Sequence, residues 1–233
     1  MNTRRILAPL LSLGFSLLLS GQTTAAPTSH DVQGTNIVLE KHVLFDAARK
    51  RPVPVAVYTD PARKVIARPL AIISHGYGIP DTAYSFIANH LASNGYYVVA
   101  VQHDVPGDAP LPMSGNAYED RKPSWERGVQ DILFVVAALK ESHTELDYAH
   151  LLLIGHSQGG DTSLLFAQEH AEMVYALISL DSRRMPFPRS NRPHILSLRS
   201  SDQQPDAGVI PNAEEQGRFG MEIVKLSDWV VLL

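Results

Sequence analysis

A serine between two glycines is the part of the sequence best suited to chemistry. The stretch Gly155-His156-Ser157-Gln158-Gly159 follows the apolar run "LLLI" and precedes "DTSLLFAQEHA", which has the composition of a helix. The two glycines let the chain turn sharply without a steric clash, and such a turn leaves the serine oxygen exposed. The strand–turn–helix context therefore predicts that Ser157 is a nucleophile. The N-terminus of the following helix favours the negative charge that develops when the serine attacks.

A serine nucleophile also requires hydrogen-bond donors for the oxyanion that forms on its substrate. One donor is the backbone N–H of the residue after the nucleophile, here Gln158. The second comes from the loop after an earlier strand. The segment "SHGYG", residues 74–78, ends such a strand, and we expect the backbone N–H of Tyr77 to be this donor.

Two aspartates follow the serine in the order expected of an acid, which precedes the histidine in sites of this type. Asp181 closes the predicted strand "ALISLD", and Asp202 follows the predicted strand "ILSLRSSD". Both positions lie where a parallel strand ends. The aspartate that is not the acid is expected to cap a loop or to pair with a nearby arginine.

The general base is harder to locate than the nucleophile. It is expected in a loop after the last strand, "GMEIVKL", but there the sequence reads only "SDWVVLL", and no histidine follows His194. Loss of one of the three catalytic groups, the serine, the acid or the histidine base, lowers turnover by about 10⁴–10⁶. If another histidine takes this role, the candidates are His103, which ends the strand before the long loop, and His75, which lies in the loop of the second oxyanion donor.

The elements that must position these residues alternate between strands and helices from about residue 70 onward. This alternation predicts an α/β fold with a mainly parallel sheet, helices on both faces and an antiparallel N-terminal strand pair. The predicted strands are 36–46, 51–60, 68–78, 96–104, 150–157, 173–181, 192–202 and 220–226. The predicted helices are 81–95, with Asp81 as N-cap and Gly95 at the end, 124–142 and 158–171.

A proline- and glycine-rich segment, residues 105–123, is predicted to be a long loop. It follows a strand at its carboxyl end, where the substrate pockets of open α/β sheets form. We expect this loop to contribute to the pocket wall, with Tyr118 and Met113 as apolar contacts. A solvated surface loop is the alternative.

The N-terminus has the pattern of a secretory signal peptide. Arg4 and Arg5 precede a mostly apolar run, residues 6–19, and small residues then lead to a cleavage site after Ala25. We therefore expect residues 1–25 to be removed and the protein to be exported to the periplasm or secreted by a bacterium. An uncleaved membrane anchor is the alternative, but the run is short for a span of about 20 residues.

The composition excludes several other classes of protein. The chain has 233 residues, 45% of them hydrophobic and 19% charged, with a net charge of −4, which predicts one folded domain over residues 26–233. It has no basic surface that would indicate nucleic acid as a partner, and it lacks cysteines. No segment of the mature chain is apolar enough for stable membrane insertion.

These motifs carry a resemblance to a known family. From about residue 36 to 226 the chain resembles the α/β-hydrolases. Residues 151–202 are similar to the platelet-activating-factor acetylhydrolase group through "GHSQGG" and "ISLDSRRMP". The resemblance implies a serine esterase acting on a small acyl or phospholipid-like ester, with no metal or organic cofactor. It favours Asp181 over Asp202, because the connection to the next strand is short. Chlorophyllases and polyester-cleaving cutinases share much of this layout.

The family's pattern also predicts a histidine-bearing loop and a closing helix after the last strand, and this sequence has neither. We therefore expect the product of a truncated or frameshifted esterase gene, with the last helix missing and one face of the sheet uncovered. Two functions stay open: a carboxylic-ester hydrolase, or an inactive hydrolase-fold protein that at most binds an ester-like ligand. A peptidase is a weaker third, because nothing in the sequence indicates recognition of a peptide amine.

Overall fold

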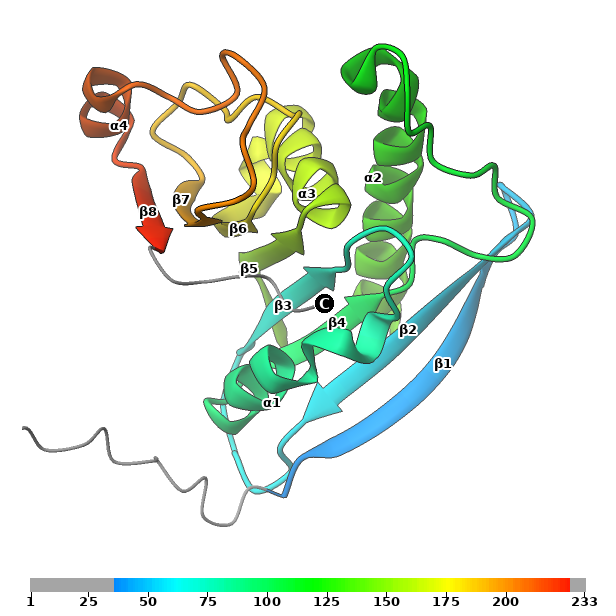
Figure 1. The fold of residues 1–233 in the computed structure, drawn as a ribbon. Helices are drawn as coiled ribbons and strands as arrows, with labels where there is room; N and C mark the ends of the chain where they lie inside the picture. Colours follow the sequence, from blue (N-terminus) through cyan, green and yellow to red (C-terminus); the bar gives the residue numbers. More distant parts are fainter. Residues whose placement is uncertain (1–35, 227–233) are drawn as a thin grey trace, which may run out of the picture. The chain divides into compact units, whose positions relative to one another are not determined.

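A computed structural model describes residues 36–226 as one eight-stranded sheet with helices packed on both faces (Figure 1). The strand order is β1-β2-β4-β3-β5-β6-β7-β8. The strands are β1 (Val38–Asp46), β2 (Arg51–Thr59), β3 (Arg68–Ser74), β4 (Tyr97–Val101), β5 (Leu146–His156), β6 (Val174–Leu180), β7 (His194–Ser200) and β8 (Glu222–Leu226). The helices are η1 (Asp81–Tyr84), α1 (Ser85–Ser93), α2 (Ala117–Ser142), α3 (Gln158–Glu169), η2 (Ala171–Met173) and α4 (Ala213–Phe219).

The strand directions confirm the predicted α/β class. β1 pairs with β2 and β2 with β4 in antiparallel fashion, and the other neighbouring pairs are parallel. The carboxyl ends of the parallel strands therefore share one edge of the sheet, and the turn between β5 and α3 lies on it. The predicted signal peptide and its cleavage site lie outside the described residues, as do the last seven residues.

Alternate residues of the central strands pack into two separate cores. Ile72 and its neighbours face α2 and α3, where Trp125 and Phe166 are fully buried. Ala71 and Ile73 face the opposite side, against the short helix α1. This alternation follows from the period of two along a strand, and it packs α2 and α3 against one face of the sheet and α1 against the other. No helix in the described part of the chain has the length and apolar character needed to cross a bilayer.

Two local expectations were wrong. Helix α2 begins at Ala117, so the loop after β4 is shorter than predicted. Asn116 caps this helix by accepting the N–H groups of Tyr118 and Glu119, and Pro123 is tolerated because it lies near the helix start. Asp81 is not an N-cap, because it is the first residue of the 3₁₀ turn η1.

Helix α4 was not predicted, although its start carries a recognisable signal. Asn212 and Glu215 form a capping box, in which each side chain accepts the backbone N–H of the other residue. The helix ends at Gly220, which adopts the left-handed conformation with φ +64°. Seven residues are too few to give a clear helical period in the sequence.

A buried aspartate joins the N-terminal hairpin to the helical layer. Asp131 on α2 is fully buried. Its carboxylate forms ion pairs with two arginines of the β1–β2 hairpin, at 2.8 Å from Arg49 Nη1 and 3.2 Å from Arg51 Nε. Its second oxygen lies 3.4 Å from Nδ1 of His103. Arg51 also donates to the carbonyl of His103 at 2.6 Å and pairs with Asp108. The tip of the hairpin is thus bonded to the segment that follows β4 (Figure 1).

We expect Asp131→Asn to lower the free energy of unfolding by about 3 kcal/mol or more, because two arginines would lose their buried partner. Urea denaturation monitored by circular dichroism would measure the change. Glu126→Gln on the same helix is the control, since Glu126 is exposed and a surface change of this kind alters stability by less than about 0.5 kcal/mol. Equal effects of the two substitutions would contradict a stabilising role for the buried cluster.

Candidate active site

Ser157 occupies the junction between β5 and α3 with a strained backbone. Its φ is +50° and its ψ −113°, a region that residues other than glycine rarely adopt. Two hydrogen bonds hold it there. Its N–H donates to the carbonyl of Leu180 at 2.8 Å, and its own carbonyl accepts the N–H of Asp161 at 2.9 Å. Strain of this kind persists only where the surroundings enforce it, and it is concentrated at functional sites.

The glycines around Ser157 are required by close backbone approaches. A Cβ atom on Gly155 would collide with the carbonyl of Gly159. A Cβ on Gly159 would collide with the carbonyl oxygens of Ser74 and His75, at the end of β3. The first turn of α3 therefore packs directly against the loop that contains the second predicted oxyanion donor.

The structure brings the two predicted oxyanion residues to this same region. Gln158 is the first residue of α3, so its N–H is among those that have no partner within the helix. Its side chain turns away toward α2 and donates to Ser124 Oγ at 2.6 Å. Tyr77 lies in the turn after β3, where its hydroxyl accepts the N–H of Leu111 at 3.1 Å.

The two candidate acids have different environments. Asp181, directly after β6, is 6% exposed and has φ +51°, a second strained position beside Ser157. Its carboxylate accepts the N–H of Ser200 at 2.8 Å, and its own N–H donates to Leu198 at 3.1 Å. Asp202 is exposed, and its carboxylate accepts an N–H of the neighbouring Gln203 side chain at 3.3 Å.

The histidines considered as replacement bases are engaged elsewhere. His75 contacts the carbonyl of Gly76 through Nδ1 and the N–H of His103 through Nε2. His103 contacts Ser74 Oγ through Nε2 and Asp131 through Nδ1. Within residues 36–226, no histidine ring is in hydrogen-bond contact with the hydroxyl of Ser157.

The ring of His156, next to the serine, points into the protein. Its Nδ1 lies 2.6 Å from the hydroxyl of Tyr84, on the side of α1. Burial lowers the pKa of His156 below its usual value, although the nearby charge of Asp181 acts in the opposite direction. The ring of His156 therefore ties the serine turn to Tyr84.

Asp161 is a structural part of the site that the sequence analysis missed. It is buried on α3, and one carboxylate oxygen accepts three successive N–H groups, those of Arg183, Arg184 and Met185, at 3.0–3.2 Å. Burial raises its pKa to about 6, against the effect of those three hydrogen bonds. The residue fixes the segment after Asp181 to α3. In the sequence it resembles any acidic residue in the first turn of a helix.

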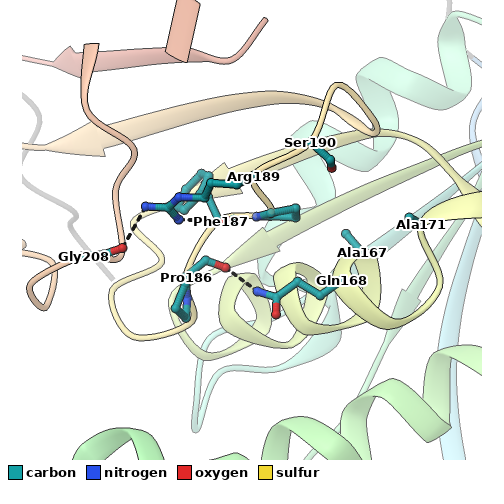
Figure 2. Close-up of a pocket in the computed structure, with 9 residues that line it drawn as sticks. Ala167, Gln168, Ala171, Pro186, Phe187, Arg189, Ser190 and Gly208 are labelled. Atoms are coloured by element: carbon teal, nitrogen blue, oxygen red, sulfur yellow. Dashed lines mark hydrogen bonds between the residues drawn. The ribbon is translucent and has the colours of Figure 1, made fainter. Parts of the chain in front are cut away.

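The predicted pocket residues lie on or near the start of α2. Tyr118 packs edge-on against Trp125 with ring centres 5.6 Å apart, and Met113 is 77% exposed beside Arg121. A cavity of about 600 Å³ lies elsewhere, at the opposite end of α3, and neither residue lines it. Figure 2 shows this cavity, where Gln168 donates to Pro186 and Arg189 to Gly208. At 1.5 Å per residue, Gln168 lies roughly 15 Å along the helix from Gln158.

Metal-binding geometry is not found in the described part of the chain. Residues 36–226 contain no group of three histidine, aspartate or glutamate side chains placed to hold an ion. What the described residues bring together is a strained serine, a buried aspartate and backbone N–H groups at one edge of the sheet.

Comparisons with known proteins agree with this architecture. Residues 66–181 match the family model Hydrolase_4, described as serine aminopeptidase, S33. Chlorophyllase-1 of Arabidopsis thaliana is 28% identical over 152 residues, which cover 60% of this chain and 44% of the relative. Platelet-activating factor acetylhydrolase of Cavia porcellus is 31% identical over 148 residues, covering 46% of this chain and 33% of the relative. The chain thus spans less than half the length of either relative.

A solved structure shows the same fold at lower identity. Ferulic acid esterase from Streptomyces cinnamoneus superimposes with a TM-score of 0.61 and 20% identity, covering 86% of this chain and 74% of that chain. The fold and the sequence matches together place the protein in the α/β-hydrolase superfamily. The sequence relatives indicate a serine hydrolase family, while the solved structure at 20% identity shows the fold alone.

We expect Gly159→Ala to lower the free energy of unfolding by about 1–3 kcal/mol, because the new methyl group must displace the backbone of β3 or α3. Gly217→Ala is the matched control. Gly217 lies within α4 with open space around it, so alanine there should raise stability by about 0.5–1 kcal/mol. Urea titration of both variants would measure the two changes, and a Gly159 variant as stable as wild type would show that the close approach is not a constraint.

Proposed function

We propose that this protein is a serine carboxylic-ester hydrolase in which Ser157 is the nucleophile and a small-molecule ester is the substrate. The observation that carries the proposal is the strained φ of +50° at Ser157, held between Leu180 and Asp161 at the start of α3. The similarity to chlorophyllase and to platelet-activating factor acetylhydrolase supports an ester as substrate.

In the proposed reaction, Ser157 Oγ forms a bond to the acyl carbon while a base takes the hydroxyl proton. The carbonyl oxygen becomes an oxyanion that accepts the backbone N–H groups of Tyr77 and Gln158. Collapse of this intermediate breaks the bond to the alcohol, which leaves with the proton held by the base. Water then attacks the acyl-serine by the same steps and releases the acid.

We assign Asp181 as the acid that orients and stabilises the protonated base. Its burial and its hydrogen bond to Ser200 hold the carboxylate still, whereas Asp202 is exposed. Asp181 also follows β6, the strand whose last residue, Leu180, binds the N–H of Ser157. The two residues are thus held on adjoining strands.

Within residues 36–226, no histidine contacts the hydroxyl of Ser157 and could serve as its base. This observation favours a second candidate function, a hydrolase-fold protein that binds an ester-like ligand without turning it over. The two candidates differ in a measurable way, because a site that lacks only its base can be assisted by a small base added to the solution.

We expect p-nitrophenyl acetate and butyrate to be hydrolysed faster by the purified protein than by its Ser157→Ala variant. Each protein is also assayed with added imidazole, and the variant supplies the background for imidazole-catalysed hydrolysis in solution. Turnover without imidazole would mean that the chain supplies its own base. Turnover only with imidazole would mean that the nucleophile and oxyanion site are intact and the base is missing. Equal rates of both proteins under both conditions would contradict the proposed hydrolase and support the second candidate.

For turnover that uses the protein's own base, we expect Asp181→Asn to lower kcat by about 10⁴. Asp202→Asn is the matched control and should change kcat by no more than a few-fold, because Asp202 is exposed. Steady-state kinetics with p-nitrophenyl butyrate would separate the two. A larger loss in the Asp202 variant would transfer the role of the acid to that residue.

A further inference from the structure

The imidazole of His75 has hydrogen bonds that define its tautomer. Its Nε2 lies 2.9 Å from the backbone N of His103 and 3.1 Å from Nε2 of Gln102. A backbone N–H can only donate, so Nε2 of His75 is an acceptor and carries no proton. The proton of the neutral ring is therefore on Nδ1, which lies 2.7 Å from the carbonyl oxygen of Gly76 and donates to it.

The environment keeps this ring neutral. His75 is 2% exposed, and burial lowers its pKa to about 4, with the charge of His103 acting in the same direction. The groups that oppose this effect are the Gly76 carbonyl and Asp104, and they do not outweigh it. At neutral pH the ring is thus one acceptor and one donor in fixed positions.

The Nδ1–H of His75 binds the carbonyl of the Gly76–Tyr77 peptide group, and the N–H of the same peptide group has a proposed role of its own. A trans peptide is planar, so the carbonyl of Gly76 and the N–H of Tyr77 point in opposite directions. Holding the carbonyl oxygen toward His75 therefore aims the Tyr77 N–H away from the ring. That N–H is one of the two donors proposed for the oxyanion.

Few other hydrogen bonds hold the Gly76–Tyr77 peptide group. Tyr77 lies between two glycines, which have no side chain to restrict rotation of the peptide, and Gly78 has φ +73°. The Gly76 carbonyl receives one other bond, from the N–H of Ile79 at 3.2 Å, which is longer than the bond from His75. On the other side, the N–H of Gly76 has a long contact of 3.4 Å with Tyr84 Oη.

We propose that His75 is a positioning residue that sets the direction of the Tyr77 N–H in the oxyanion site. The proposal builds on the proposed hydrolase function and deepens it. His75 does not touch the substrate. It acts through the Gly76–Tyr77 peptide, and it is itself held by the backbone of His103.

Two substitutions separate the two ends of the ring. Asparagine at position 75 can place an amide N–H near the position of Nδ1, so His75→Asn keeps the bond to Gly76 and loses the acceptor for His103. Glutamine can place its oxygen near the position of Nε2, so His75→Gln keeps the contact with His103 and loses the bond to Gly76. Thermal unfolding of both variants reports the structural cost of each change.

We expect His75→Gln to lower kcat for p-nitrophenyl butyrate by about 10–100-fold with KM unchanged. This is less than the 10²–10³ typical of deleting an oxyanion donor, because Ile79 still binds the carbonyl. His75→Asn should retain kcat within a few-fold. The rate ratio of an ester to its thionoester should fall in the glutamine variant alone, since a misdirected N–H no longer favours oxygen over sulfur. These assays use whichever condition, with or without imidazole, gives turnover that depends on Ser157.

Nuclear magnetic resonance tests the same proposal without turnover. The ¹⁵N shifts of the His75 ring should show a protonated Nδ1 and an unprotonated Nε2. The Tyr77 amide resonance should move in His75→Gln and stay near its wild-type position in His75→Asn. The opposite tautomer, or equal effects of the two variants on kcat and on the amide, would overturn the proposal. If no Ser157-dependent turnover exists, the hydrolase function fails, and the tautomer and the amide shift alone decide whether His75 positions Tyr77.

Discussion

The site depends on one close contact, between Gly159 at the start of α3 and the carbonyl oxygens of Ser74 and His75 at the end of β3. No side chain fits between the two backbones, so the helix begins against the sheet edge and the chain must turn at Ser157 within a single residue. That constraint accounts for the positive φ at the serine. It also brings the turn that contains Tyr77 beside the residues that follow the serine, because both segments are parts of the same contact.

A second set of contacts fixes the segment around Asp181 relative to the same helix. The carboxylate of Asp161 accepts three backbone N–H groups of the segment after β6, and the N–H of Ser157 donates to the carbonyl of Leu180, the last residue of that strand. Asp181 is therefore positioned by α3 as well as by its own strand. Helix α3 therefore holds both the turn after β3 and the segment after β6, and Ser157 lies between these two sets of contacts.

Much of the fold could be predicted from local sequence, because the signals were local. Apolar runs ending in glycine mark β3 and β5, and the pentapeptide from Gly155 to Gly159 marks the turn between β5 and α3. The errors came where the deciding interaction was a side-chain cap. The amide of Asn116 begins α2 seven residues before the expected start, and a capping box builds α4 from a segment too short to show a period. The roles of Asp161 and Asp131 depend on partners distant in the chain, which a single sequence does not reveal.

The hydrogen bonds around His103 extend this site well beyond the serine turn. Its backbone N–H binds His75, its ring binds Asp131, and Asp131 in turn binds the arginines at the tip of the β1–β2 hairpin. The hairpin tip and the turn that contains Tyr77 are therefore connected through a chain of polar groups that passes through the fully buried Asp131. A transplant of this site onto another scaffold, or a minimised version of the protein, would have to carry the hairpin with it, although the hairpin contributes no group to the proposed reaction.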